Sequence, residues 1–64
     1  MTIKLTVPGM ACPACANNIT NAVKAIDANA NVKADPKTKL VNVDTQASET
    51  AIKQALVAAG YPPA

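Results

Sequence analysis

The stretch TIKLTVPGMACPACANNITNAVKAI, residues 2–26, contains the two patterns that decide the fold. Apolar and polar residues alternate over residues 2–7, which is typical of a strand with one buried face, and Pro8-Gly9 ends the alternation. Further on, apolar residues from Ile19 to Ile26 recur at the i, i+3, i+4, i+7 spacing of an amphipathic helix. The stretch therefore predicts a strand followed by a helix over about residues 13–26.

Two short strand-like runs follow this helix, at residues 31–34 and 40–44. They flank Asp35-Pro36-Lys37-Thr38, in which Asp at the first position and Pro at the second suit a type I turn. We therefore predict a hairpin that turns its Val and Ala side chains inward and its polar residues to solvent.

A second amphipathic helix is predicted over about residues 49–59, with Ser48 as its N-cap and Gly60 as its C-terminal stop. The order strand, helix, strand, strand, helix predicts an α+β fold with both helices on one face of an antiparallel sheet. A fourth strand would complete this split βαβ arrangement. Only residues 61–64 remain for it, and two of them are prolines, which cannot donate to a sheet ladder. We expect the last strand to be short or absent.

Size and composition restrict the function. The 64 residues are 50% hydrophobic and contain one aromatic residue, Tyr61, so a single small core and no deep substrate cavity are expected. A formal charge of +2 does not indicate nucleic acid binding. No apolar run is long enough for membrane insertion, and the N-terminus lacks the layout of a signal peptide, so a cytoplasmic location with both cysteine thiols free is expected.

The two cysteines stand at the predicted start of the first helix. If Pro13 takes the first helical position, where its missing N–H costs nothing, Cys12 is the N-cap and Cys15 the third helical residue. Side chains in this relation converge on the helix end, whose unpaired N–H groups and dipole favour negative charge. Both effects lower a thiol pKa and raise the fraction of thiolate that binds metal.

The kind of metal follows from the available ligands. The chain has no His, and its first acidic residue is Asp27, so the loop offers two thiolates. A tetrahedral zinc site needs four donors, usually Cys or His, whereas sulfur ligands in small number suit the soft Cu(I) ion. Such a site is open, so a partner's thiols could take the ion by ligand exchange.

The segment GMACPAC, residues 9–15, resembles the GMxCxxC motif of the heavy-metal-associated domain, and the match extends over nearly the whole chain. The resemblance implies a ferredoxin-like βαββαβ open sandwich in one domain, residues 1–64. It also implies a copper chaperone of bacterial type, not an enzyme, that delivers Cu(I) to a partner such as the metal-binding domain of a P-type ATPase. Cys12 and Cys15 would be the ligands.

Other positions have expected roles around this site. By the resemblance, Met10 is a core anchor that steadies the loop, and packing is a more common role for such a Met than metal ligation. Pro13 adjoins the cysteines, and Tyr61 corresponds to a position near the metal loop, where its hydroxyl could donate to a sulfur or its ring could simply cover the core. Lys24 and Lys53, on the polar helix faces, are candidates for partner docking, although exposed lysines usually just keep a domain soluble.

Other functions are also compatible with the sequence. A CxxC at a helix start also resembles a thioredoxin-type redox pair, but the chain is short for that fold. The same module also occurs as a regulatory domain of a larger transporter or in a mercury-handling enzyme. A monomer is expected without metal, and two sulfurs leave coordination capacity for a copper-bridged dimer when no partner is present.

Overall fold

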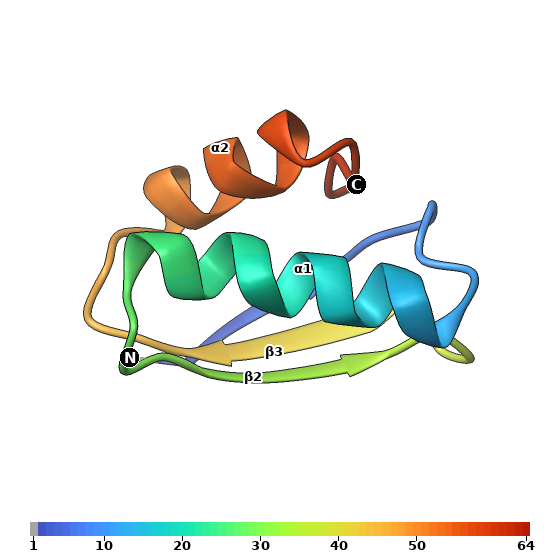
Figure 1. Ribbon diagram of the computed structural model, residues 1–64, viewed down its shortest axis with the longest axis horizontal. Helices are drawn as coiled ribbons and strands as arrows, with labels where there is room; N and C mark the ends of the chain where they lie inside the picture. Colours follow the sequence, from blue (N-terminus) through green and yellow to red (C-terminus); the bar gives the residue numbers. More distant parts are fainter. Residues whose placement is uncertain (1) are drawn as a thin grey trace.

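The computed structural model describes residues 2–64, and it has two helices and three strands in that range. In chain order these are β1 (Thr2–Thr6), α1 (Pro13–Ile26), β2 (Asn31–Asp35), β3 (Leu40–Asp44) and α2 (Glu49–Ala58). Figure 1 shows both helices on the same face of the sheet, and the other face is uncovered. The predicted two-layer α+β arrangement is therefore confirmed.

The sheet is antiparallel, with β3 in the centre and β1 and β2 at its edges. Its register matches the alternation in the sequence, because the inward apolar residues of the three strands pair with one another. The two inward rows are Ile3, Val43 and Val32, then Leu5, Val41 and Ala34. The row between them, Lys4, Asn42 and Lys33, is polar and belongs to the uncovered face. A slip of one residue would exchange the two faces, so burial fixes this register.

The core lies between the sheet and the helices and is built from aliphatic side chains and one Met. Each helix contributes two fully buried residues, which are Ile19 and Val23 from α1 and Ile52 and Leu56 from α2. Burial of one such side chain contributes about 1.5–3 kcal/mol to folding. A core of this size leaves little surplus stability. Substitution of a residue that packs both in the core and under the loop of residues 7–12 should therefore lower the stability of the domain markedly.

The hairpin between β2 and β3 turns at the predicted place, and β2 is one residue longer than predicted. The strand β2 extends to Asp35, which pairs with Leu40, so four residues remain in the loop. The backbone N–H of Lys39 donates to the carbonyl of Asp35 at 2.8 Å, and Lys39 has a left-handed φ of 65°. The inward pairing of Ala34 with Val41 sets this loop length, and the turn adapts to it.

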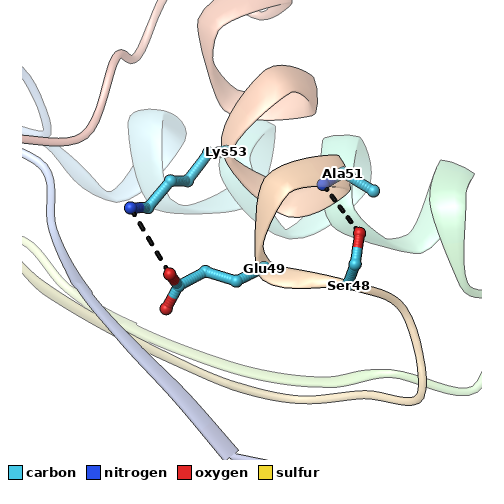
Figure 2. A network of polar contacts seen from close by, with 4 residues as sticks. All are labelled: Ser48, Glu49, Ala51 and Lys53. Atoms are coloured by element: carbon cyan, nitrogen blue, oxygen red, sulfur yellow. Dashed lines mark hydrogen bonds and ion pairs between the residues drawn. The ribbon is translucent and has the colours of Figure 1, made fainter.

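The second helix is capped at both ends as predicted. The Ser48 hydroxyl accepts a hydrogen bond from the Ala51 N–H at 3.1 Å, as Figure 2 shows. At the other end Gly60 has a φ of 89°, and its N–H donates to the carbonyl of Val57. The Tyr61 N–H donates to the carbonyl of Leu56 at 2.8 Å. This pair of bonds is a Schellman motif, which requires the left-handed conformation that glycine adopts without strain.

The tail after Gly60 forms no strand, in agreement with the expectation of a short or absent last strand. Within residues 2–64, one backbone hydrogen bond joins it to the sheet, from the Ala64 N–H to the carbonyl of Thr6 at 2.7 Å. Pro62 and Pro63 have no N–H to extend this contact into a ladder. The tail therefore follows the β1 edge with a single bond.

The helix–strand connections gather at two opposite ends of the molecule. We call one the loop end; it holds the loop of residues 7–12, the hairpin turn of residues 36–39 and the tail, on the right of Figure 1. At the opposite end, the Asp27 carboxylate accepts hydrogen bonds from the Thr45 hydroxyl at 2.7 Å and the Asn29 N–H at 3.0 Å. No helix within residues 2–64 has the length and apolar character needed to cross a membrane.

Candidate metal centre

The two cysteines lie at the loop end, where the α1 helix begins. Cys12 is the N-cap, with an extended backbone, and its sulfur accepts a hydrogen bond from the Cys15 N–H at 3.4 Å. Pro13 occupies the first helical position, and the Cys12 carbonyl accepts the first helical hydrogen bond, from Ala16. The predicted helix start is thus confirmed, and it directs both side chains to the same point.

The sulfur atoms of Cys12 and Cys15 are 2.7 Å apart, and both thiols are free. Both residues are only partly buried, so an ion or a partner's thiol can reach them from solvent. Within residues 2–64 no group of three or more His, Cys, Asp or Glu side chains is placed to hold a metal ion. Among these residues, the loop end therefore supplies two thiol donors and no third ligand of these types.

The electrostatic surroundings favour the thiolate form of Cys15. Its pKa falls from an ordinary 9.0 to about 7, first because of the hydrogen bond with the Cys12 thiol and next because of that with the Tyr61 hydroxyl. The backbone at Ala11 adds a smaller contribution in the same direction. A lowered thiol pKa at Cys15 agrees with the sequence analysis. The sequence analysis attributed it to the helix N–H groups and dipole, whereas the largest contributions come from the side chains of Cys12 and Tyr61.

Tyr61 reaches the cysteines from the opposite helix. The Schellman motif fixes its backbone just after α2, and its ring packs against the core. Its hydroxyl lowers the pKa of Cys15 through a hydrogen-bond contribution, and Cys15 in turn raises the pKa of Tyr61. The hydroxyl also accepts a hydrogen bond from the side-chain amide of Asn18 at 3.2 Å. The expected packing of Tyr61 on the core is confirmed, and the pKa shifts of Tyr61 and Cys15 agree in direction with a donor near the sulfur.

Met10 is fully buried, in the core beneath the loop, which agrees with the role of an anchor. The loop is held from two sides. The Met10 N–H donates to the carbonyl of Val7 at 3.1 Å, and the Lys39 ammonium donates to the carbonyl of Met10 at 2.8 Å. The Val7 N–H in turn donates to the carbonyl of Lys39. The hairpin turn thus supports the cysteine loop through its main chain and one cation.

Sequence reasoning missed Asn18 and Lys39 at the loop end. Asn18 is 43 positions from Tyr61, and Lys39 is 29 positions from Met10. No short-range pattern connects such distant positions, so only the packing of the elements reveals them. The sole local hint was that Asn18 follows Cys15 by three residues, which puts both on one side of a helix.

The two lysines suggested for partner docking lie on different helices. Lys24 is in the last turn of α1, about 18 Å along the helix axis from Cys12 at 1.5 Å per residue. Lys53 forms an ion pair with Glu49 on the surface of α2 at 3.5 Å, as Figure 2 shows. An exposed pair of this kind contributes about 0–1 kcal/mol and partly neutralises the lysine. Their docking role stays a prediction without support from this geometry.

The chain belongs to the heavy-metal-associated domain family, whose model matches residues 4–62. This confirms the resemblance drawn from residues 9–15 and the ferredoxin-like fold. Among curated proteins no match is found.

Solved structures give close matches over nearly the full length. A trimeric form of a mutant of the copper chaperone Atx1 from Synechocystis PCC6803 shares 40% sequence identity, with 97% of this chain and 98% of that chain covered and a TM-score of 0.94. A gold binding protein also shares 40% identity, with coverages of 94% and 92% and a TM-score of 0.91. A heavy metal binding protein from Thermotoga maritima shares 25% identity, with coverages of 98% and 91% and a TM-score of 0.85.

Proposed function

We propose that this chain is a copper chaperone that binds one Cu(I) ion between the thiolates of Cys12 and Cys15. The observation that carries the proposal is the convergence of two free, partly exposed sulfurs at the start of α1, 2.7 Å apart. The similarity to a copper chaperone supports the choice of ion. We also propose that residues 1–64 act as one domain in a reducing compartment such as the cytoplasm, where thiols stay free.

The charge at this site suits a soft monovalent ion. Two thiolates and one Cu(I) carry a net charge of −1, and the positive end of the α1 dipole stabilises an anionic complex at its N-terminus. The pKa of about 7 at Cys15 means that little free energy is needed to deprotonate this sulfur at neutral pH. Both features favour binding without any further protein ligand.

Binding requires the sulfurs to separate. With a metal–sulfur bond of about 2.3 Å, as for zinc, an ion in line between two sulfurs needs them about 4.6 Å apart. Cys12 lies in an extended segment ahead of the helix and is partly exposed, so its side chain can rotate outward while Cys15 stays on the helix. This rotation of the Cys12 side chain also lets a partner's thiolate bind the ion and then replace Cys12, which is what ligand exchange requires.

Transfer to a partner is the second half of the proposal. Because the site uses two protein donors, an incoming pair of thiolates, such as those of a P-type ATPase metal-binding domain, can take the ion through a three-coordinate intermediate. With no partner present, a second copy of the chain can supply the extra sulfur. Sedimentation of the protein with and without Cu(I) tests for this copper-bridged dimer.

A second candidate cargo is gold. The similar gold binding protein favours it, because two thiolates suit soft ions in general. It differs from the first candidate in the ion carried and not in the site.

Competition titrations with Cu(I), Au(I) and Zn(II) against chelators of known affinity test both candidates. The parent and the Cys12→Ser and Cys15→Ser variants are compared, and Ser keeps the shape of Cys with a much weaker donor for soft ions. We expect tight Cu(I) binding by the parent, weak Zn(II) binding, and a loss of at least about a hundredfold in Cu(I) affinity in each variant, since one of two ligands is lost. Equal Cu(I) binding by the parent and either Ser variant would disprove the two-thiolate site.

A further inference from the structure

The Tyr61 hydroxyl is shared by two side chains of α1. The amide nitrogen of Asn18 donates to its oxygen at 3.2 Å, and Cys15, three residues earlier in α1, has its pKa lowered by the same hydroxyl. An amide NH₂ can only donate, and a phenol has a single proton. Asn18 therefore uses the hydroxyl as an acceptor, and the proton of Tyr61 remains available for the sulfur. The chain of hydrogen bonds runs in one direction, from Asn18 through Tyr61 to Cys15.

The fold places these three groups together. Asn18 and Cys15 are three residues apart in α1, so their side chains lie on one side of the helix. Tyr61 arrives from the end of α2, where the Schellman motif fixes its main chain and the core holds its ring. A phenol held at its ring can still rotate its O–H bond. Asn18 restricts this last degree of freedom.

We propose that Asn18 is a positioning residue for the metal site, which holds the Tyr61 O–H toward Cys15 and so slows the loss of Cu(I) from that sulfur. This inference rests on the proposed function. The physical reason is twofold. The hydrogen bond stabilises negative charge on the sulfur of the anionic complex, and the hydroxyl covers Cys15 against an incoming thiolate. Attack by a partner then begins at Cys12, the sulfur outside the helix.

The test measures the rate at which loaded protein transfers Cu(I) to an excess of a coloured chelator. Asn18→Ala and Tyr61→Phe should each accelerate transfer about three- to tenfold, the effect expected for loss of one net hydrogen bond. The double variant should be no faster than Tyr61→Phe, because Asn18 acts through the hydroxyl. Asn17→Ala is the matched control, since Asn17 is the neighbouring residue of the same type and is also exposed, whereas the hydrogen bond to Tyr61 comes from Asn18.

An isosteric variant separates positioning from packing. Asn18→Asp keeps the shape of the side chain but replaces the donor by a carboxylate, which only accepts hydrogen bonds. It should draw the Tyr61 proton away from Cys15 and accelerate transfer at least as much as Asn18→Ala. Asn18→Asp in the Tyr61→Phe background measures the effect of the added charge alone on the transfer rate. The difference between its effects in the two backgrounds is the contribution of the hydrogen bond to Tyr61.

A metal-free measurement completes the test. Tyr61 is the only aromatic residue in the chain, so near-ultraviolet circular dichroism reports on its ring alone. Asn18→Ala should change this signal while Asn17→Ala leaves it unchanged, and the side-chain amide resonances of Asn18 should shift in Tyr61→Phe. A parent that loads with Cu(I) but an Asn18→Ala variant that transfers as slowly as Asn17→Ala would overturn the inference alone. A parent that does not load would overturn the proposed function itself.

Discussion

Met10 offers a test that separates a core anchor from a metal ligand. Its side chain is fully buried. Truncation of a buried Met to Ala costs about 2–5 kcal/mol, whereas the volume-conserving change to Leu costs under about 1.5 kcal/mol. A domain of 64 residues has a total stability of about 3–10 kcal/mol at 0.05–0.15 kcal/mol per residue. Met10→Ala therefore removes a large part of the stability, and Met10→Leu a small part.

Thermal unfolding and Cu(I) competition measure the two roles separately. At about 4–8 °C per kcal/mol, Met10→Leu should lower the Tm of metal-free protein by less than about 12 °C, and Met10→Ala by more than about 8 °C. Met10→Leu should bind Cu(I) as tightly as the parent, because a thioether in the core contributes no bond to the ion. Met10→Ala should bind less tightly, since the loop loses its support.

Ile52→Ala is the matched control for this experiment. Ile52 is equally buried but belongs to α2, away from the cysteine loop. It should lower the Tm by a similar amount and leave Cu(I) affinity nearly unchanged, so the difference from Met10→Ala isolates support of the loop. A loss of tenfold or more in the affinity of a well-folded Met10→Leu variant would refute the reasoning and make the Met10 sulfur a ligand.

The remaining predictions concern pH and helix capping. Since the pKa of Cys15 is about 7, the thiolate absorbance at 240 nm should show that about half of one thiol is ionised near pH 7 in metal-free protein. A thiol with a pKa of 9.0 would be only about 1% ionised at that pH. A transition near pH 7 that survives in Cys15→Ser would contradict this. A lowered folded pKa also means that metal-free stability should rise between pH 7 and 9, an increase that Cys15→Ser should lack. The hydrogen bond from Thr45 lowers the pKa of Asp27, so its stabilising effect is complete above its unfolded value of about 3.9 and is lost as pH falls through the lower folded value. Urea unfolding should show a smaller loss between pH 7 and pH 3 in Asp27→Asn than in the parent, and equal losses would argue against the assignment. Ser48→Ala should lower the free energy of unfolding by about 1 kcal/mol, whereas Thr50→Ala, in the first turn but with no capping bond, should change it little.

The fold could be predicted because its signals are local. Alternation over residues 2–7, the helical spacing from Ile19 to Ile26 and the stop at Gly60 each depend on neighbours within one or two turns. The helix start at Pro13 followed in the same way from the N-cap position of Cys12. The hairpin turn followed from Asp35 and Pro36, but the extension of β2 to Asp35 depends on the pairing of this residue with Leu40 and not on the turn residues alone.

The surroundings of the cysteines depended on contacts between distant segments. That both sulfurs converge was implied by their spacing, but the support of the loop by Lys39 and the bond from Asn18 to Tyr61 arise only when both helices and the hairpin are packed together. The lysines suggested for docking from helix polarity show how far such a pattern reaches, and their role stays a prediction. Polarity identifies an exposed face, but it does not tell which end of the helix lies near the site.

The Schellman motif at the end of α2 links fraying of this helix to the exposure of Cys15. Two main-chain hydrogen bonds, to the carbonyls of Val57 and Leu56, hold the segment that carries Tyr61. Helix ends open locally far more often than a domain unfolds. Each time this last turn opens, the Tyr61 hydroxyl leaves Cys15, and the sulfur is uncovered while the core stays intact. On the proposed role of Tyr61, local opening of this turn exposes Cys15 from that side, so Gly60, far from the cysteines in sequence, would contribute to the rate of Cu(I) exchange.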